Sequence, residues 1–152
     1  FNMIQMEVPG CVFLDLFSGS GGIALEAVSR GAKKAVLVEN SRKAAACIQD
    51  NINFTKFNSF CDLKVMDALS ALRTLERRYV FDIIYMDPPY QKGLELEALE
   101  YLKTSSLITE DTLIIIETGL DADISEYESG GYYAISRQKK YKTNQHVFLQ
   151  KR

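Results

Sequence analysis

Short runs of hydrophobic residues alternate along this sequence with segments in which hydrophobic positions recur every three or four residues. Runs of the first kind predict buried β-strands, and segments of the second kind predict helices with one apolar face. The predicted strands cover residues 11–16, 35–38, 61–65, 81–86 and 112–117, and the predicted helices cover residues 22–29, 42–53, 69–77 and 94–103. This alternation is typical of an α/β fold built on a parallel sheet.

Local signals mark the ends of the predicted helices. Gly31 ends the first helix. Ser41 is a suitable N-cap for the second helix, in which Ala44, Ile48 and Ile52 recur at a spacing of four on one face. These signals agree with the periodicity.

The C-terminal part of the sequence changes character. Residues 132–139 and 145–150 predict two strands joined by a short polar turn, so we expect a mostly parallel, seven-stranded sheet that ends in an antiparallel hairpin. No repeat, low-complexity stretch or linker divides the 152 residues, a length that suits one domain with a full core. We therefore predict a single domain over residues 1–152.

Composition and cysteine usage exclude several classes of protein. Hydrophobic residues make up 47% of the chain and charged residues 25%, so neither disorder nor a fibrous repeat is expected. No apolar run reaches the ~18–20 residues that span a bilayer, and the first residues do not resemble a signal peptide. Cys11, Cys47 and Cys61 form no C-x-x-C pair, and His146 has no partner at metal-ligand spacing. We expect a cytoplasmic protein without metal or membrane partner, whose reduced thiols serve as small core residues.

Charge is unevenly distributed. Six of the 18 Lys and Arg residues lie within residues 137–152, which contain no Asp or Glu, whereas the rest of the chain holds all 20 acidic residues. The six are Arg137, Lys139, Lys140, Lys142, Lys151 and Arg152. A basic edge on an acidic domain is compatible with contact to nucleic-acid phosphates, and equally with a solvated hairpin.

A glycine-rich turn follows the first predicted strand. Residues 15–21 read Asp-Leu-Phe-Ser-Gly-Ser-Gly, and Gly19 and Gly21 permit positive φ and close approach of a ligand. A ligand of such a fold binds at a topological switch point, here beyond the carboxyl ends of the first, second and fourth strands. The turn also satisfies G-x-G-x-x-A, and Glu39 lies 20 residues after Gly19, so a nicotinamide dinucleotide is one alternative.

Acidic residues at three strand ends favour S-adenosylmethionine instead. Asp15 would lie poorly beside a pyrophosphate but well beside the α-ammonium of that cofactor. Glu39 can accept hydrogen bonds from two ribose hydroxyls, the other interpretation being an exposed charge that closes a strand. Asp67, followed by Ala68, can accept from an adenine amino group or cap a helix, and the two roles are compatible.

The fourth predicted strand ends in Asp87-Pro88-Pro89-Tyr90. The two prolines fix φ and remove two N–H donors, so a rigid extended loop is expected. Asp87 and the Pro88 carbonyl match the two hydrogens of an exocyclic amine on a base, and Tyr90 offers a ring for stacking. Such hydrogen bonds favour a pyramidal nitrogen whose lone pair faces a sulfonium methyl, and the proton can leave through Asp87 or water.

Together these segments resemble the RsmD family, class I S-adenosylmethionine-dependent methyltransferases that modify guanine N2 in bacterial 16S ribosomal RNA. The resemblance covers nearly the whole chain and rests on the turn at 15–21, Leu-Glu-Ala-Val-Ser-Arg-Gly at 25–31, Val38-Glu39, Asp67-Ala68, and Asp-Pro-Pro-Tyr-Gln-Lys-Gly-Leu at 87–94. It implies a Rossmann-like three-layer sandwich. The D-P-P-Y element alone is shared with adenine-N6 methyltransferases.

Carried over position by position, the resemblance implies two sets of site residues. The catalytic set, which contacts the target base, is Asp87, Pro88, Pro89 and Tyr90. The cofactor-binding set is Asp15, Phe17, Ser18, Gly19, Gly21, Glu39, Asn40, Asp67, Ala68 and Asp87. Members of the family begin with a basic segment carrying an Arg-Pro-Thr-like motif, and we expect the domain to lack that segment here.

The leading hypothesis is methyl transfer from S-adenosylmethionine to the N2 amine of a guanine in 16S ribosomal RNA. The expected partner is that RNA or a small-subunit assembly particle, and the expected enzyme is a monomer. An amino methyltransferase acting on adenine N6 is the alternative. A NAD-dependent oxidoreductase and a non-catalytic RNA-binding module are more remote.

Overall fold

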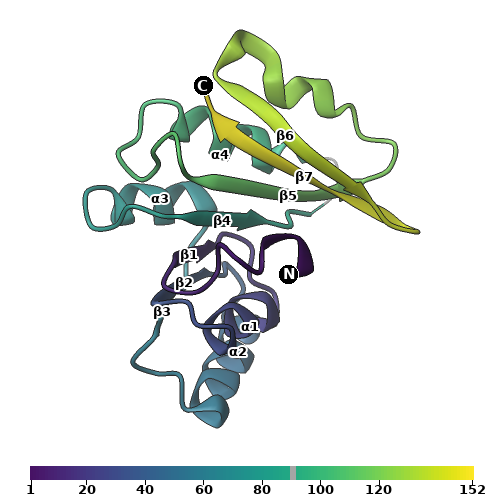
Figure 1. The fold of residues 1–152 in the computed structure, drawn as a ribbon. Helices are drawn as coiled ribbons and strands as arrows, with labels where there is room; N and C mark the ends of the chain where they lie inside the picture. Colours follow the sequence, from purple (N-terminus) through teal and green to yellow (C-terminus); the bar gives the residue numbers. More distant parts are fainter. Residues whose placement is uncertain (90–91) are drawn as a thin grey trace.

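A computed structural model describes residues 1–89 and 92–152 and arranges them in three layers (Figure 1). The described strands are β1 (Val12–Asp15), β2 (Lys34–Val38), β3 (Cys61–Lys64), β4 (Ile83–Met86), β5 (Leu113–Gly119), β6 (Tyr133–Lys140) and β7 (Asn144–Lys151). The described helices are α1 (Gly22–Ser29), α2 (Arg42–Thr55), α3 (Ala68–Leu75) and α4 (Leu94–Leu102), with 3-10 segments η1 (Asn2–Ile4) and η2 (Ile124–Gly131). The predicted order of strands and helices is confirmed.

The strands form one sheet in the order β3-β2-β1-β4-β5-β7-β6. β1 to β5 are parallel to their neighbours, whereas β7 is antiparallel to both β5 and β6. The predicted antiparallel hairpin is therefore present, with β7 on the inner side. Because the chain winds outward from β1 in both directions, the topological switch point lies between β1 and β4.

Alternate strand residues pack on opposite faces of the sheet, as the two-residue period of a strand requires. Leu14, Val36 and Ile84 belong to the core cluster that includes α3 and α4. Phe13 and Leu37 belong to a second cluster, which includes α1, α2 and the N-terminal segment. Helices on both faces explain why the central strands are apolar almost throughout.

Helix caps fix where the strand-to-helix loops turn. The Ser41 hydroxyl accepts a hydrogen bond from the Ala44 N–H at 3.2 Å, so the predicted N-cap of α2 is confirmed. The buried face of this helix contains Ala45 with Ile48 and Ile52, rather than the expected Ala44, which is only half-buried. The shift of one position is the difference between a strict spacing of four and the true helical period.

The cysteine prediction is correct for one residue and wrong for another. Cys11 is buried, Cys61 is half-buried, and Cys47 is exposed. Cys47 is adjacent to the buried Ile48 on α2, where successive side chains point about 100° apart, and this rotation carries it to the solvent side. Within residues 1–89 and 92–152, none of the helices has the length and apolar character needed to cross a bilayer.

Candidate active site

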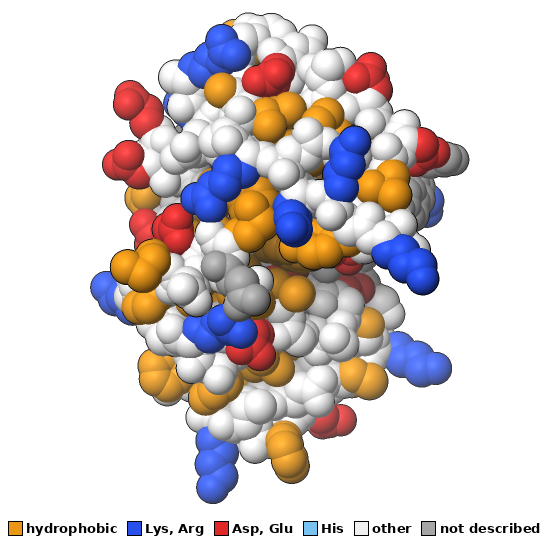
Figure 2. All heavy atoms as spheres, turned by 45° about the vertical axis from the view of Figure 1, so that its right-hand side comes forward, with side chains coloured by type: hydrophobic (Ala, Val, Ile, Leu, Met, Phe, Trp, Pro, Cys, Tyr) orange, Lys and Arg blue, Asp and Glu red, His pale blue; other side chains and the backbone are white. Residues whose placement is uncertain are grey.

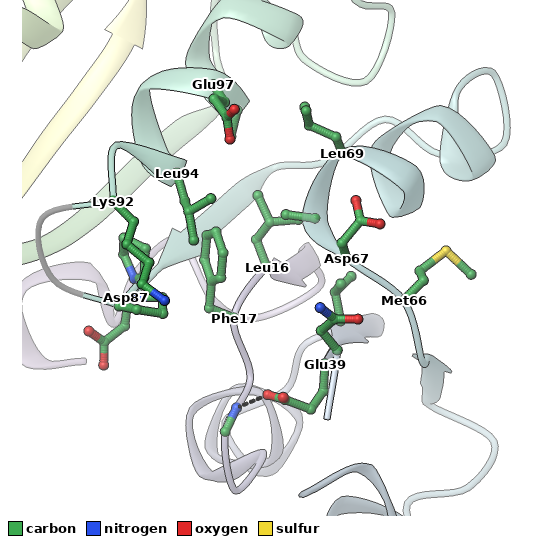
Figure 3. Close-up of a pocket in the computed structure, with 17 residues that line it drawn as sticks. Leu16, Phe17, Glu39, Met66, Asp67, Leu69, Asp87, Lys92, Leu94 and Glu97 are labelled. Atoms are coloured by element: carbon green, nitrogen blue, oxygen red, sulfur yellow. Dashed lines mark hydrogen bonds between the residues drawn. The ribbon is translucent and has the colours of Figure 1, made fainter. Parts of the chain in front are cut away.

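A cavity of about 770 Å³ opens beyond the carboxyl ends of the parallel strands (Figure 3). Its walls come from the segments that follow β1, β2, β3 and β4, and from the start of α4. We refer to it as the strand-end cavity. Among the residues predicted to bind a cofactor, those that line it are Phe17, Gly19, Glu39, Asn40, Asp67, Ala68 and Asp87.

A second cavity, of about 370 Å³, lies against the glycine-rich turn, and we refer to it as the glycine-loop cavity. Asp15, Ser18 and Tyr85 line this cavity. Phe17, Gly19 and Asp87 line both cavities, so the two adjoin. Every residue of the predicted cofactor set except Gly21 therefore lines one of two neighbouring spaces.

Glu39 fastens the glycine-rich turn to the end of β2. Its Oε1 accepts a hydrogen bond from the Gly19 N–H and its Oε2 accepts one from the Ser41 N–H, both at 2.9 Å (Figure 3). The side chain is half-buried, so the interpretation as an idle exposed charge is wrong. A carboxylate oxygen has more than one lone pair, so Glu39 keeps acceptor capacity toward the cavity.

Asp67 begins α3 and faces the strand-end cavity from the opposite side (Figure 3). Its carboxylate accepts hydrogen bonds from the Ser70 N–H at 2.9 Å and from the Ser70 hydroxyl at 2.8 Å. These bonds lower the pKa of Asp67. The predicted N-cap role is confirmed, and it leaves this ionised acceptor on the cavity wall.

Asp15 is the most buried acidic side chain of the site, with 1% of its surface exposed. Its Oδ1 has no hydrogen-bond partner among the described residues. Burial raises the pKa of Asp15 to about 7, and the charges of Asp87 and Glu39 add to the effect. A buried acceptor without a donor is costly, so this oxygen calls for a ligand that brings one.

Gly21 does not line either cavity but shapes the turn that forms them. It is the N-cap of α1 with φ +81°, and an added Cβ would lie 3.2 Å from Ile48 Cγ2 and from Leu37 Cδ2. The predicted positive φ at Gly19 and Gly21 is confirmed, at +58° and +81°. At Gly21, backbone conformation and close packing both exclude a side chain.

We expect Gly21→Ala to lower the free energy of unfolding by about 2–4 kcal/mol, because it adds overpacking to left-handed strain. Gly10→Ala is the matched control, since Gly10 has φ +79° and an added Cβ there would meet nothing within 4 Å. Only the conformational cost, about 1–2 kcal/mol, applies at that position. Urea unfolding of both variants measures the difference, and equal reductions in stability would show that packing at Gly21 is unimportant.

Asp87, Pro88 and Pro89 form a corner at the end of β4. This corner lines the strand-end cavity and a third cavity of about 290 Å³, which also contacts Thr143 and Asn144 of the β6–β7 hairpin. We refer to the third space as the hairpin cavity. Tyr90, the remaining residue predicted to be catalytic, lies outside the described residues. Asp87 thus lies where all three cavities meet.

The surroundings of Asp87 include residues that sequence analysis did not identify. Burial raises the pKa of Asp87, and the charge of Glu117 raises it further. Glu117 Oε1 accepts a hydrogen bond from the Tyr85 hydroxyl at 2.6 Å and lies 3.0 Å from His146 Nε2. The expectation that His146 has no partner is therefore wrong in three dimensions, because pairing of β5 with β7 places it opposite Glu117.

Comparison with known proteins adds an independent finding. A family model described as Conserved hypothetical protein 95 matches residues 1–150. The putative rRNA methyltransferase YlbH of Bacillus subtilis is 30% identical over 142 residues, which cover 93% of this chain and 76% of YlbH. Ribosomal RNA small subunit methyltransferase D of Haemophilus influenzae is 29% identical over 122 residues, 80% of this chain and 63% of that protein. The chain thus spans less than two-thirds of the latter relative.

Solved structures show the same arrangement of strands and helices. A conserved hypothetical protein of Streptococcus pyogenes is 38% identical, with a TM-score of 0.89, over 100% of this chain and 92% of that chain. The putative methyltransferase yhhF of Escherichia coli is 24% identical, with a TM-score of 0.84, over 99% of this chain and 81% of that chain. At that level of identity the second match concerns the fold.

Proposed function

The chain belongs to the RsmD family of methyltransferases, and from this membership we propose that it methylates the N2 amine of a guanine in small-subunit ribosomal RNA. Its strand order is the Rossmann-like arrangement of class I methyltransferases. The observation that carries the proposal is the position of Asp87, which joins two cavities lined by the cofactor set to a third one beside the basic hairpin.

The residues present suit S-adenosylmethionine as methyl donor. Asp15 Oδ1 is a buried acceptor without a partner among the described residues, and the α-ammonium of that cofactor brings both a positive charge and N–H donors. Glu39 and Asp67 offer carboxylate oxygens at opposite sides of the strand-end cavity, for ribose hydroxyls and for an adenine amino group. When bound, S-adenosylmethionine supplies an electrophilic methyl group on a sulfonium.

The chain's own contribution to transfer is positioning of the target amine. An aromatic amine is a weak nucleophile because its lone pair is delocalised into the ring. In the proposed complex Asp87 and the Pro88 carbonyl accept its two N–H groups, which favours a pyramidal nitrogen aimed at the methyl group. Proline at 88 and 89 keeps this corner rigid, and Asp87 or water takes the proton that the amine loses.

The β6–β7 hairpin supplies the surface for RNA. Its turn joins Lys140 to Asn144, and Thr143 and Asn144 line the hairpin cavity beside the Asp87 corner. In the view that brings this end of the molecule forward, Lys and Arg side chains stand around a hollow lined by apolar groups (Figure 2). Positive charge beside a hollow of this kind suits an RNA backbone next to an unstacked base.

Replacement of Lys139 and Lys140 with glutamine should weaken RNA binding and reduce its salt dependence. In the described part of the chain neither lysine forms an ion pair, whereas Arg137 contacts Glu7 and Arg152 lies near Glu128. Each phosphate that is no longer neutralised should lower the slope of log K against log salt concentration by roughly 0.7–0.9. Filter binding at several salt concentrations measures the slope.

The control replaces Lys33 and Lys56, two exposed lysines near the amino edge of the sheet, and should leave the slope unchanged. A slope equal to wild type in the Lys139 and Lys140 variant would show that the hairpin does not touch phosphate.

The proposed function is tested with small-subunit ribosomal RNA and assembly particles from a strain that lacks the corresponding gene. Incubation with the protein and labelled S-adenosylmethionine, followed by nucleoside analysis, should yield N2-methylguanosine. N6-methyladenosine would instead establish the alternative amino methyltransferase. Calorimetry should show binding of S-adenosylhomocysteine, and binding of NADH in its place would overturn the methyltransferase assignment.

A further inference from the structure

The hairpin cavity contains a second carboxylate beside the one that is proposed to hold the target amine. Asp87, Pro88 and Pro89 form one wall, and Glu117 at the end of β5 lines the same space. The cavity is completed by Glu95, Thr118 and the hairpin residues already described. A base whose amine is bound at Asp87 therefore presents its adjoining ring atoms to a wall that contains Glu117.

Glu117 is held in place through one of its two oxygens. Oε1 accepts the 2.6 Å hydrogen bond from Tyr85 and adjoins His146 Nε2. Oε2 has one contact in the described part of the chain, with Asn144 Nδ2 at 3.5 Å, the outer limit for a hydrogen bond. The side chain is 24% exposed, so it is fixed by neighbours but reachable. Its second oxygen is consequently a positioned acceptor with spare capacity.

The atom next to the amine distinguishes the bases. In guanine the N2 amine adjoins N1–H, which is a hydrogen-bond donor. In adenine the N6 amine adjoins N1, and in cytosine the N4 amine adjoins N3, and both of these nitrogens are acceptors. An ionised carboxylate can only accept hydrogen bonds. A carboxylate beside the amine site therefore attracts guanine and repels the lone pairs of the other two bases.

We propose that Glu117 accepts the hydrogen bond of guanine N1–H and so selects guanine over other amino bases, an inference that rests on the proposed methyl transfer. Asp87 and Pro88 hold the amine, which all three bases possess, so they cannot choose among them. Glu117 reads the neighbouring position. Tyr85 and His146 hold Glu117 and act as positioning residues, because their contacts fall on the oxygen that turns away from this role.

A base analogue tests the proposal in the wild-type protein. 2-Aminopurine carries the same amine at C2 but has an unprotonated N1, so it lacks the donor that Glu117 would accept. We expect kcat/KM for an RNA with 2-aminopurine at the methylated position to be about 10- to 100-fold lower than for the guanosine RNA, the value of one charge-assisted hydrogen bond. Equal kcat/KM values for the two RNAs would overturn the proposal.

Glu117→Gln assigns the effect to this residue. With its oxygen kept toward Tyr85, the amide would point N–H donors at guanine N1–H, and these can pair with the acceptor N1 of 2-aminopurine. The variant should lose about 10- to 100-fold on guanosine RNA and little or nothing on 2-aminopurine RNA. Glu95→Gln removes the other glutamate of the cavity and should keep the wild-type ratio. Equal loss on both RNAs in Glu117→Gln, or loss of the ratio in both variants, would overturn the assignment.

Two further readouts separate a failure of this inference from a failure of the proposed function. S-Adenosylhomocysteine affinity and the melting temperature, measured for each variant, identify general damage to the fold, and the wild-type comparison of the two RNAs does not depend on any variant. If the wild-type protein methylates guanosine RNA and ignores N1, only the inference about Glu117 fails. If it methylates no ribosomal RNA, the proposed function fails, and the inference with it.

Discussion

Asp87→Ala should lower the rate of methyl transfer by roughly 100- to 1,000-fold while changing the affinity for S-adenosylhomocysteine only about threefold or less. The carboxylate is expected to hold the amine in the transition state, and the glycine-rich turn, Glu39 and Asp67 hold the rest of the cofactor. Because the side chain lies where three cavities meet, its loss should affect chemistry more than binding. Single-turnover transfer and calorimetry measure the two effects separately.

Two comparisons sharpen the experiment on Asp87. Asp87→Asn keeps one carbonyl oxygen as an acceptor for the amine, so it should retain more activity than the alanine variant. Asp111→Ala removes an exposed carboxylate before β5, far from the corner, and should behave as wild type. Transfer by Asp87→Ala within a few-fold of wild type would refute the role of this carboxylate.

Asp15→Asn should weaken binding of S-adenosylhomocysteine by about 10- to 100-fold, because the amide cannot neutralise the α-ammonium of the ligand. In the wild-type protein the affinity should rise with pH and level off above neutrality, because the pKa of Asp15 is raised to about 7 and only the ionised form attracts the ammonium. The asparagine variant should lack this rise. Calorimetry between pH 5.5 and pH 8.5, roughly the range around that pKa, checks both statements.

The same substitution should stabilise the ligand-free protein at neutral pH. The pKa of Asp15 in the folded chain, about 7, is higher than its ordinary value of 3.8, so the folded state binds the proton more tightly than the unfolded state. This stabilising contribution is complete below about pH 4 and is lost as the pH rises through 7, by up to about 4 kcal/mol. Asp15→Asn removes the loss, and urea unfolding at about pH 5 and about pH 8 should show it. An unchanged pH dependence would mean that Asp15 is not the titrating group.

Most of the fold could be predicted because local and global signals agree along this chain. The apolar runs before Asp15, Glu39 and Asp87 are buried on both faces, so they stand out as continuous strands, and parallel strands place their ends together. The predicted ligand residues follow from that geometry, since a residue that closes such a strand must lie at the switch-point edge. Ser41 and Asp67 were identified by helix-cap chemistry, which acts over three residues.

What could not be predicted depends on pairing between distant strands. The contact between Glu117 and His146 requires that β7 pair with β5 in one particular register. The sequence shows that a hairpin follows, but it does not show which of its strands joins the sheet. A register irregularity between Ile135 and Arg137 further offsets β6 from β7. His146 therefore looked isolated, although it belongs to the wall of a cavity.

The position of β7 between β5 and β6 bears on how the molecule is made. A ribosome delivers β6 first, yet β6 reaches the sheet only through β7, so the open edge of β5 stays without its neighbour until residue 151 has emerged. During that interval the nascent chain exposes an isoleucine-rich strand edge of the kind that associates with other chains. The wall proposed to recognise the base is the last to be synthesised, so a chain arrested shortly before its end could hold the methyl donor without being able to choose a target.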